Sequence, residues 1–151
     1  LGHVACTAFG SGLAWALILA AGVAGNALEA YCFPGRHLAV GASSAGFGAL
    51  GLLVAHRALQ HARRWQFTAP AWRQFGFPVL AGLCLLALLG AGPGSDLVAH
   101  ALGMASGGVL GAAVGAAGTP KPRPWIQRAL EVACLALLML AWRIVFGNDA
   151  K

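Results

Sequence analysis

Five apolar runs, each long enough to cross a bilayer as a helix, constrain this chain more than any other feature. They cover residues 12–31, 41–63, 75–91, 96–118 and 125–146. About 20 helical residues at ~1.5 Å rise cross a ~30 Å hydrocarbon core. Because backbone groups in lipid must bond within their segment or in a closed barrel, and no strand-like alternation competes, the runs indicate helices. The predicted fold is an all-α membrane protein, a polytopic bundle of about five transmembrane helices.

The composition excludes the main soluble classes of protein. Of the 151 residues, 59% are hydrophobic and 9% are charged, whereas about 25% is the usual charged fraction of a soluble domain. Such a chain cannot cover its surface with polar groups, so the lipid bilayer is its predicted environment. The net charge of +6 comes from short clusters between the apolar runs rather than from one solvated face, and we therefore predict no nucleic-acid partner.

The distribution of cations predicts the orientation of the bundle. Loops rich in Lys and Arg stay in the cytoplasm. The ends that follow the second and fourth runs carry Arg57, Arg63, Arg64, Arg73, Lys121, Arg123 and Arg128, whereas the opposite ends carry only Arg36, Arg143 and Lys151. We therefore place loops 64–74 and 119–124 in the cytoplasm and loops 32–40 and 92–95 outside. The abundance of alanine and glycine favours a bacterial inner membrane.

The chain divides into a predicted core at 1–118, a proline-rich cytoplasmic linker at 119–124, and an additional transmembrane helix with a short tail at 125–151. Its four cysteines, Cys6, Cys32, Cys84 and Cys134, are far apart and have no metal-ligand spacing. We interpret them as small hydrophobic residues and predict neither a metal nor a cofactor. Because the first residue is Leu1, we expect the chain to begin within a longer protein.

Two polar residues lie where the topology predicts a shared depth. Ser43 is at the outward start of the second run, and His100 is just inside the outward start of the fourth. Histidine near pH 7 can take the proton of a serine hydroxyl, and a serine at a helix N-terminus lies beside unpaired N–H groups. Either these residues form a catalytic dyad, or Ser43 is a helix cap and His100 bonds a helix carbonyl.

Glycines in the same two runs favour close packing of the predicted helices. Gly103, Gly107 and Gly111 repeat at intervals of four and form one groove along the fourth run. Between helices in lipid, such small residues let backbones approach each other. We expect the groove to bring the helices of Ser43 and His100 together.

Both segments resemble motifs of the rhomboid intramembrane serine proteases. Residues 41–51, GASSAGFGALG, are similar to the family's GASGA nucleophile motif and the FGLLG-like residues after it. Residues 99–107, AHALGMASG, match its AHxxGxxxG motif without a gap. One predicted span separates the two motifs, as in the family, and the resemblance covers residues 12–118.

The resemblance implies a serine endopeptidase that cleaves transmembrane or membrane-adjacent segments of other proteins near the outer face. Ser43 would be the nucleophile and His100 the base, with no cofactor. Two alternatives stay open: a rhomboid-like pseudoprotease that binds membrane clients, and a transporter or channel subunit. A binding protein needs neither Ser43 nor His100, and a transporter predicts internal repeats, of which we find no convincing example.

Some positions depart from the family pattern or have two interpretations. Ser44 stands where the family has glycine, and the motif still places the nucleophile at Ser43. His3 and Thr7 form an HxxxT pattern similar to the family's HxxxN oxyanion donors, yet they lie so near the next run that we expect those donors upstream of Leu1. Asp96 is interpreted as a helix cap rather than a third catalytic member.

Asn26 and Glu29 either line a wet cavity or mark an interface. His56 and His61 are expected on a solvated cytoplasmic face, and Ser106 is not expected to act as a nucleophile.

Overall fold

The computed structural model describes residues 1–34, 42–63, 80, 83–84, 87–88, 97–118 and 122–147. Over these residues the fold is entirely helical. Five helices have defined bounds: α1 (Gly2–Phe9), α2 (Ser11–Cys32), α3 (Ser43–Arg63), α5 (Leu97–Ala116) and α6 (Pro124–Phe146). Helices α2, α3, α5 and α6 coincide within two residues with four of the predicted runs, which confirms the fold class.

Three of the described helices, α2, α5 and α6, are long and apolar enough to cross a membrane. Helix α3 has 21 residues and is more polar, because its last two turns carry His56, Arg57, Gln60, His61 and Arg63. The predicted span at 75–91 lies largely outside the described residues. Its described positions, Leu80, Leu83, Cys84, Ala87 and Leu88, are helical. The total of five spans therefore stays a prediction.

The chain forms two compact units. The first contains Leu17–Pro120 together with Leu1, and the second contains Gly2–Ala16 and Lys121–Lys151. Helix α2 begins in the second unit and continues into the first. Each unit has its own internal contacts.

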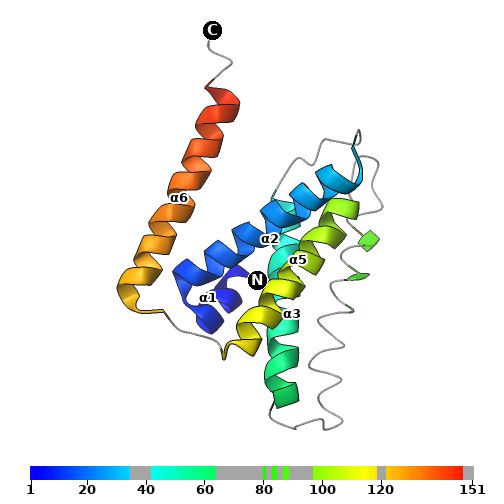
Figure 1. Cartoon of the computed structure of the whole chain (residues 1–151), viewed down its shortest axis with the longest axis vertical. Coiled ribbons are helices and arrows are strands. Elements are labelled where there is room, and N and C mark those ends of the chain that lie inside the picture. The colour runs from blue at the N-terminus through cyan, green and yellow to red at the C-terminus, as the bar shows by residue number, and fades with distance from the viewer. Residues whose placement is uncertain are drawn as a thin grey trace. The chain divides into compact units, whose positions relative to one another are not determined.

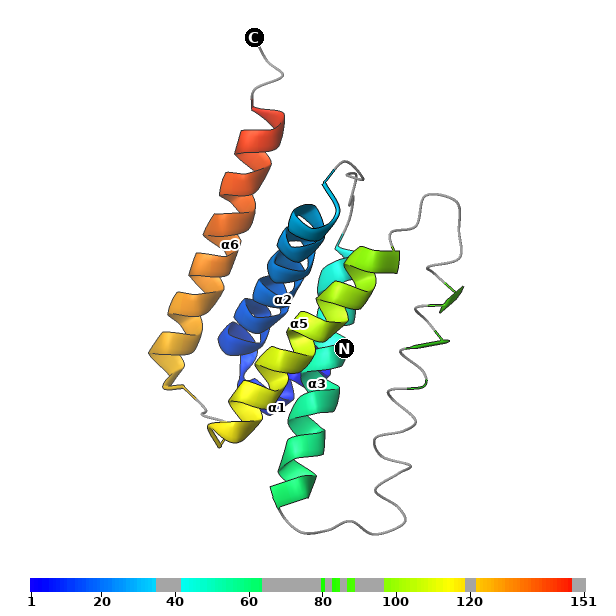
Figure 2. The ribbon, with the colours of Figure 1, turned by 45° about the vertical axis from the view of Figure 1, so that its right-hand side comes forward.

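In the first unit, α3 and α5 run side by side in the same direction (Figures 1 and 2). The predicted glycine groove forms this contact. A Cβ on Gly103 would meet the Ser44 carbonyl, one on Gly107 the Gly48 carbonyl, and one on Gly111 the Leu52 carbonyl. Each step of four residues on α5 thus matches one step of four on α3, so the backbones touch over about two helical turns.

Helix α2 runs antiparallel to α3 and α5 and packs on both. A Cβ added to Gly22 would contact Ala45 of α3, and one added to Gly25 would meet the backbone of Gly103 of α5. Both glycines belong to the same face of α2, because residues at i and i+3 are neighbours on a helix surface. The C-terminal half of α2 and the N-terminal halves of α3 and α5 are therefore held at backbone contact distance.

His56 corrects one prediction of the sequence. Its side chain is 2% exposed, and a Cβ on Gly115 of α5 would lie 3.4 Å from its Nδ1 atom. The glycine leaves room on α5 for the imidazole. The expected solvated face at His56 is therefore wrong, because tertiary contact with α5 covers this side of α3.

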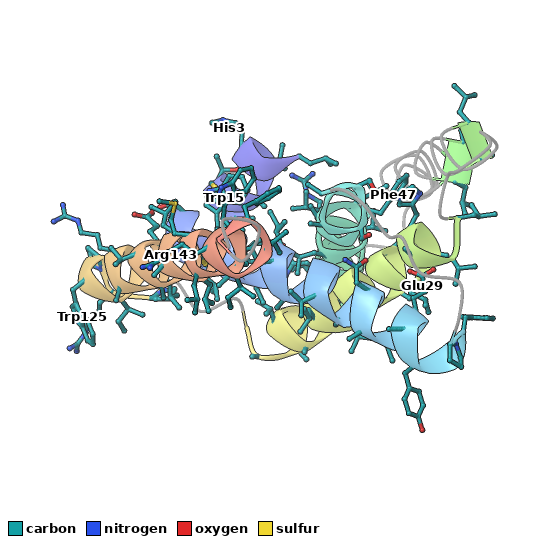
Figure 3. All side chains as sticks on the ribbon, turned by 90° about the horizontal axis from the view of Figure 1, so that it is seen from above. His3, Trp15, Glu29, Phe47, Trp125 and Arg143 are labelled. Atoms are coloured by element: carbon teal, nitrogen blue, oxygen red, sulfur yellow. The ribbon has the colours of Figure 1, made fainter. Side chains whose placement is uncertain are left out.

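The second unit contains α1, the first turns of α2, and α6. Gly10, with φ of 85°, separates α1 from α2. Helix α6 keeps most of its large apolar side chains exposed, among them Val132, Leu135 and Met139. Trp125 projects from its first turn, away from the helix (Figure 3), as aromatic side chains do at membrane interfaces.

Candidate active site

Ser43 is the first residue of α3. The first helical hydrogen bond of α3 joins the N–H of Gly46 to the carbonyl of Ala42, at 3.1 Å. The N–H groups of Ser43, Ser44 and Ala45 therefore precede the regular bonding of the helix. They form the positive end of its dipole. The Ser43 side chain is exposed, so it lies at an accessible and electropositive helix terminus.

His100 lies in the first turn of α5, and its Nε2 atom is 2.7 Å from Oγ of Ser43. These residues are 57 positions apart in the chain. Gly103, three residues after His100, allows α5 to touch the Ser44 carbonyl, and this contact sets the distance between the two helix starts. The imidazole is 7% exposed, whereas the hydroxyl it meets is accessible.

A third side chain, Phe47, holds the imidazole from α3. Its ring centroid is 4.8 Å from that of His100, and the planes are inclined by 36°. Sequence reasoning did not select Phe47. The signal available was its position four residues after Ser43, which puts both side chains on one face of α3. With Nε2 facing Ser43, the imidazole must present its other nitrogen, Nδ1, to the interior, where it has no hydrogen-bond partner among the described residues.

Ser44 occupies a different environment from its neighbour. Its side chain is 3% exposed, and its backbone carbonyl lies against Gly103. Successive residues of an α-helix are rotated by ~100°, so the hydroxyl of Ser44 cannot occupy the position of Ser43. Of the two adjacent hydroxyls, only that of Ser43 bonds His100.

The polar residues of α2 turn inward near its C-terminal end. Glu29 is 4% exposed and lies between α2 and α5 (Figure 3). The Oδ1 atom of Asn26 is buried and has no hydrogen-bond partner among the described residues. Both residues share the α2 face of Gly22 and Gly25, since all four follow the i, i+3, i+4, i+7 pattern. This part of α2 thus brings polar groups into the packed interior.

The remaining candidates have varied positions. His3 is exposed on α1, and Thr7 uses its hydroxyl to donate a 2.8 Å hydrogen bond to the Val4 carbonyl. The Oγ atom of Ser106 is buried and has no partner within the described segments. Asp96 lies outside the described residues. The role of His3 and the cap at Asp96 therefore stay predictions.

A comparison with protein families agrees with this arrangement of helices. The family model described as Rhomboid domain matches residues 1–117, which include both motifs and end one residue after α5. The comparisons with curated proteins and with solved structures find no match. The chain belongs to the rhomboid family and is a membrane protein of that family.

Proposed function

We propose that this protein is an intramembrane serine endopeptidase that acts through a Ser43–His100 dyad. The observation that carries the proposal is the 2.7 Å contact between Oγ of Ser43 and Nε2 of His100. A hydrogen bond of this length allows direct proton transfer between a nucleophile and its base. The membership of the rhomboid family supports the same activity.

In the proposed reaction, Oγ of Ser43 attacks the carbonyl carbon of a peptide bond while Nε2 of His100 accepts the hydroxyl proton. The tetrahedral intermediate collapses when His100 returns this proton to the leaving amine, so the C–N bond breaks and an ester to Ser43 remains. Water then attacks the ester, with His100 again acting as base. Hydrolysis releases the new carboxyl group and restores the free hydroxyl.

The start of α3 can stabilise the oxyanion of this intermediate. The N–H groups of Ser43, Ser44 and Ala45 precede the first helical bond of α3, and the helix dipole adds positive potential at the same place. Preorganised donors of this kind are each worth about 10²–10³ in kcat.

The proposed substrates are transmembrane or membrane-adjacent segments of other proteins. An apolar cavity of about 390 Å³ lies along α3 and α5, and Ala101, the residue after His100, is part of its wall. The cavity would accommodate apolar side chains of a substrate within the membrane. Its walls are formed by Gly51, Val54, Ala55, Leu83, Ala101, Met104, Ala105 and Gly108. Hydrolysis of the ester on Ser43 requires water at this end of α3. We propose that this end lies at the outer face of a bacterial inner membrane.

Labelling with a fluorophosphonate tests which hydroxyl reacts. We expect the reagent to modify Ser43, because only this hydroxyl bonds His100 and because Ser44 is 3% exposed. The label is measured by mass spectrometry on the full-length protein in detergent or bilayers. Ser44→Ala should keep the label and Ser43→Ala should lose it; a label that persists in Ser43→Ala and maps to Ser44 would show that the assigned register is wrong.

Phe47→Leu is expected to lower kcat by up to about 10-fold with little change in KM. An aromatic contact is worth ~0.5–1.5 kcal/mol, and ~1.4 kcal/mol corresponds to a factor of ten in rate. Cleavage kinetics of a model transmembrane substrate measure the effect. Phe146→Leu is the matched control, since Phe146 stacks on Trp142 of α6 at 4.4 Å and 37°. Equal losses in both variants would assign the effect to general stability.

The alternative function is client binding without cleavage. A binding protein needs no activated hydroxyl, so absence of both fluorophosphonate labelling and substrate cleavage in the full-length protein would favour it. Capture of an uncleaved transmembrane segment by the same protein would then identify a pseudoprotease.

A further inference from the structure

The break between α1 and α2 interrupts the regular hydrogen bonding of the helical backbone. Gly10 adopts φ of 85°, a left-handed conformation that favours glycine. Its N–H bonds the Cys6 carbonyl at 2.8 Å, and its carbonyl accepts the N–H of Ala14 at 3.0 Å. The last carbonyl of α1 is on Phe9, and the third N–H of α2, on Leu13, lies outside these bonds.

The side chain of Gln127, from the first turn of α6, bonds both groups. Its Nε2 atom donates to the Phe9 carbonyl at 3.0 Å, and its Oε1 atom accepts from the Leu13 N–H at 2.8 Å. A side chain at the start of a helix usually accepts this third N–H. That position is Gly10 here, which has no side chain. Gln127 therefore caps α2 from another helix, 114 residues away in sequence.

Two glycines make room for this contact. A Cβ on Gly10 would overlap Nε2 of Gln127, and a Cβ on Gly12 would overlap the Gln127 backbone carbonyl. Helix α6 thus approaches the junction through both its side chain and its main chain. Because polar backbone groups in an apolar surrounding are costly when unpaired, each bond at this junction matters for folding.

We propose that Gln127 is a structural clamp that makes α6 an integral part of the second unit, through its bonds to the α1–α2 junction. The family match ends at residue 117, whereas the groups that α6 satisfies lie at residues 9 and 13, within the matched region. The clamp thus makes the α1–α2 junction depend on a helix beyond the Rhomboid domain. It also fixes the start of α2, the continuous helix whose Gly22 and Gly25 pack on α3 and α5. The inference holds whether or not the protein is a protease.

The test replaces Gln127 by methionine, which keeps the approximate volume and removes both bonds. In the full chain in detergent, we expect Gln127→Met to lower the apparent Tm by about 5 °C. We also expect faster hydrogen exchange of the Leu13 amide, read by mass spectrometry on peptides that span residues 9–16. Arg128→Met, at the exposed neighbouring position on α6, is the matched control and should change neither measurement.

Two further variants keep the test decisive if Gln127→Met yields no folded protein. Gln127→Glu retains the acceptor for Leu13 but places a carboxylate oxygen against the Phe9 carbonyl, so it should lower Tm and still retain protection of the Leu13 amide. Gly12→Ala keeps the Gln127 side chain, but its added Cβ would displace the Gln127 backbone. It should therefore lower Tm and speed exchange of the Leu13 amide, as Gln127→Met does. Wild-type Tm and wild-type exchange at Leu13 in Gln127→Met, or in Gly12→Ala, would overturn the proposal.

Discussion

Ser43→Ala and His100→Ala are each expected to abolish detectable cleavage of a model transmembrane substrate. Ser43→Ala removes the atom that forms the ester in the proposed reaction, and His100→Ala removes the proposed base, whose contribution would be about 10²–10⁴-fold. Because the two side chains act as one hydrogen-bonded unit, the double variant should be no less active than the worse single variant. Rates of product formation in reconstituted bilayers measure all three.

Ser44→Ala is the matched control for this experiment. It deletes the same hydroxyl from the adjacent residue of α3, which faces the Gly103 backbone rather than His100. We expect substantial activity to remain. Full cleavage by Ser43→Ala would show that Ser43 is not the nucleophile, and full cleavage by His100→Ala would show that His100 is not the base.

Gly107→Val should produce the largest loss of stability. A Cβ at this position would overlap the Gly48 carbonyl, and a backbone atom cannot move aside as the end of a flexible side chain can. Over-packing costs typically reach about 3 kcal/mol. Separation of α5 from α3 would also lengthen the contact between His100 and Ser43, so activity should fall with stability. Thermal unfolding in detergent, followed together with substrate cleavage, measures both effects.

The neighbouring glycine supplies the control for this variant. A Cβ on Gly108 has no atom of the described residues within 4 Å, so Gly108→Val makes the same chemical change on the same helix without contact to Gly48. We expect its Tm to stay close to wild type. Equal destabilisation by the two variants would contradict the assignment of Gly107 to the α3–α5 contact.

Much of the fold followed from local pattern. Apolar length predicted the positions of α2, α3, α5 and α6, and the spacing of Gly103, Gly107 and Gly111 predicted a groove that α3 occupies. His56 shows where this reasoning failed. A polar residue near the end of a run suggested a solvated surface, but Gly115 on another helix leaves space that buries it. The sequence of α3 alone contains no sign of that space.

The candidate site shows the same limit. The motifs and the shared depth of the two helix starts predicted Ser43 and His100 as a pair. Only the tertiary structure shows their 2.7 Å contact, the burial of Ser44 and the position of the Phe47 ring beside His100. Gln127 was not selected at all, since an isolated glutamine near the start of a run has no local signature. Its partners lie 118 and 114 residues away.

By itself, the sequence determined that this chain is a helical membrane protein and which of its residues carry reactive groups. The apolar length of a segment and the need to satisfy its backbone in lipid are local properties, so they can be read along the chain. Tertiary structure alone decided how closely the Ser43 hydroxyl meets the imidazole and which side chain closes the α1–α2 break. Those outcomes depend on how the glycines let particular backbones approach one another, and a distance between two helices is a property of neither helix alone.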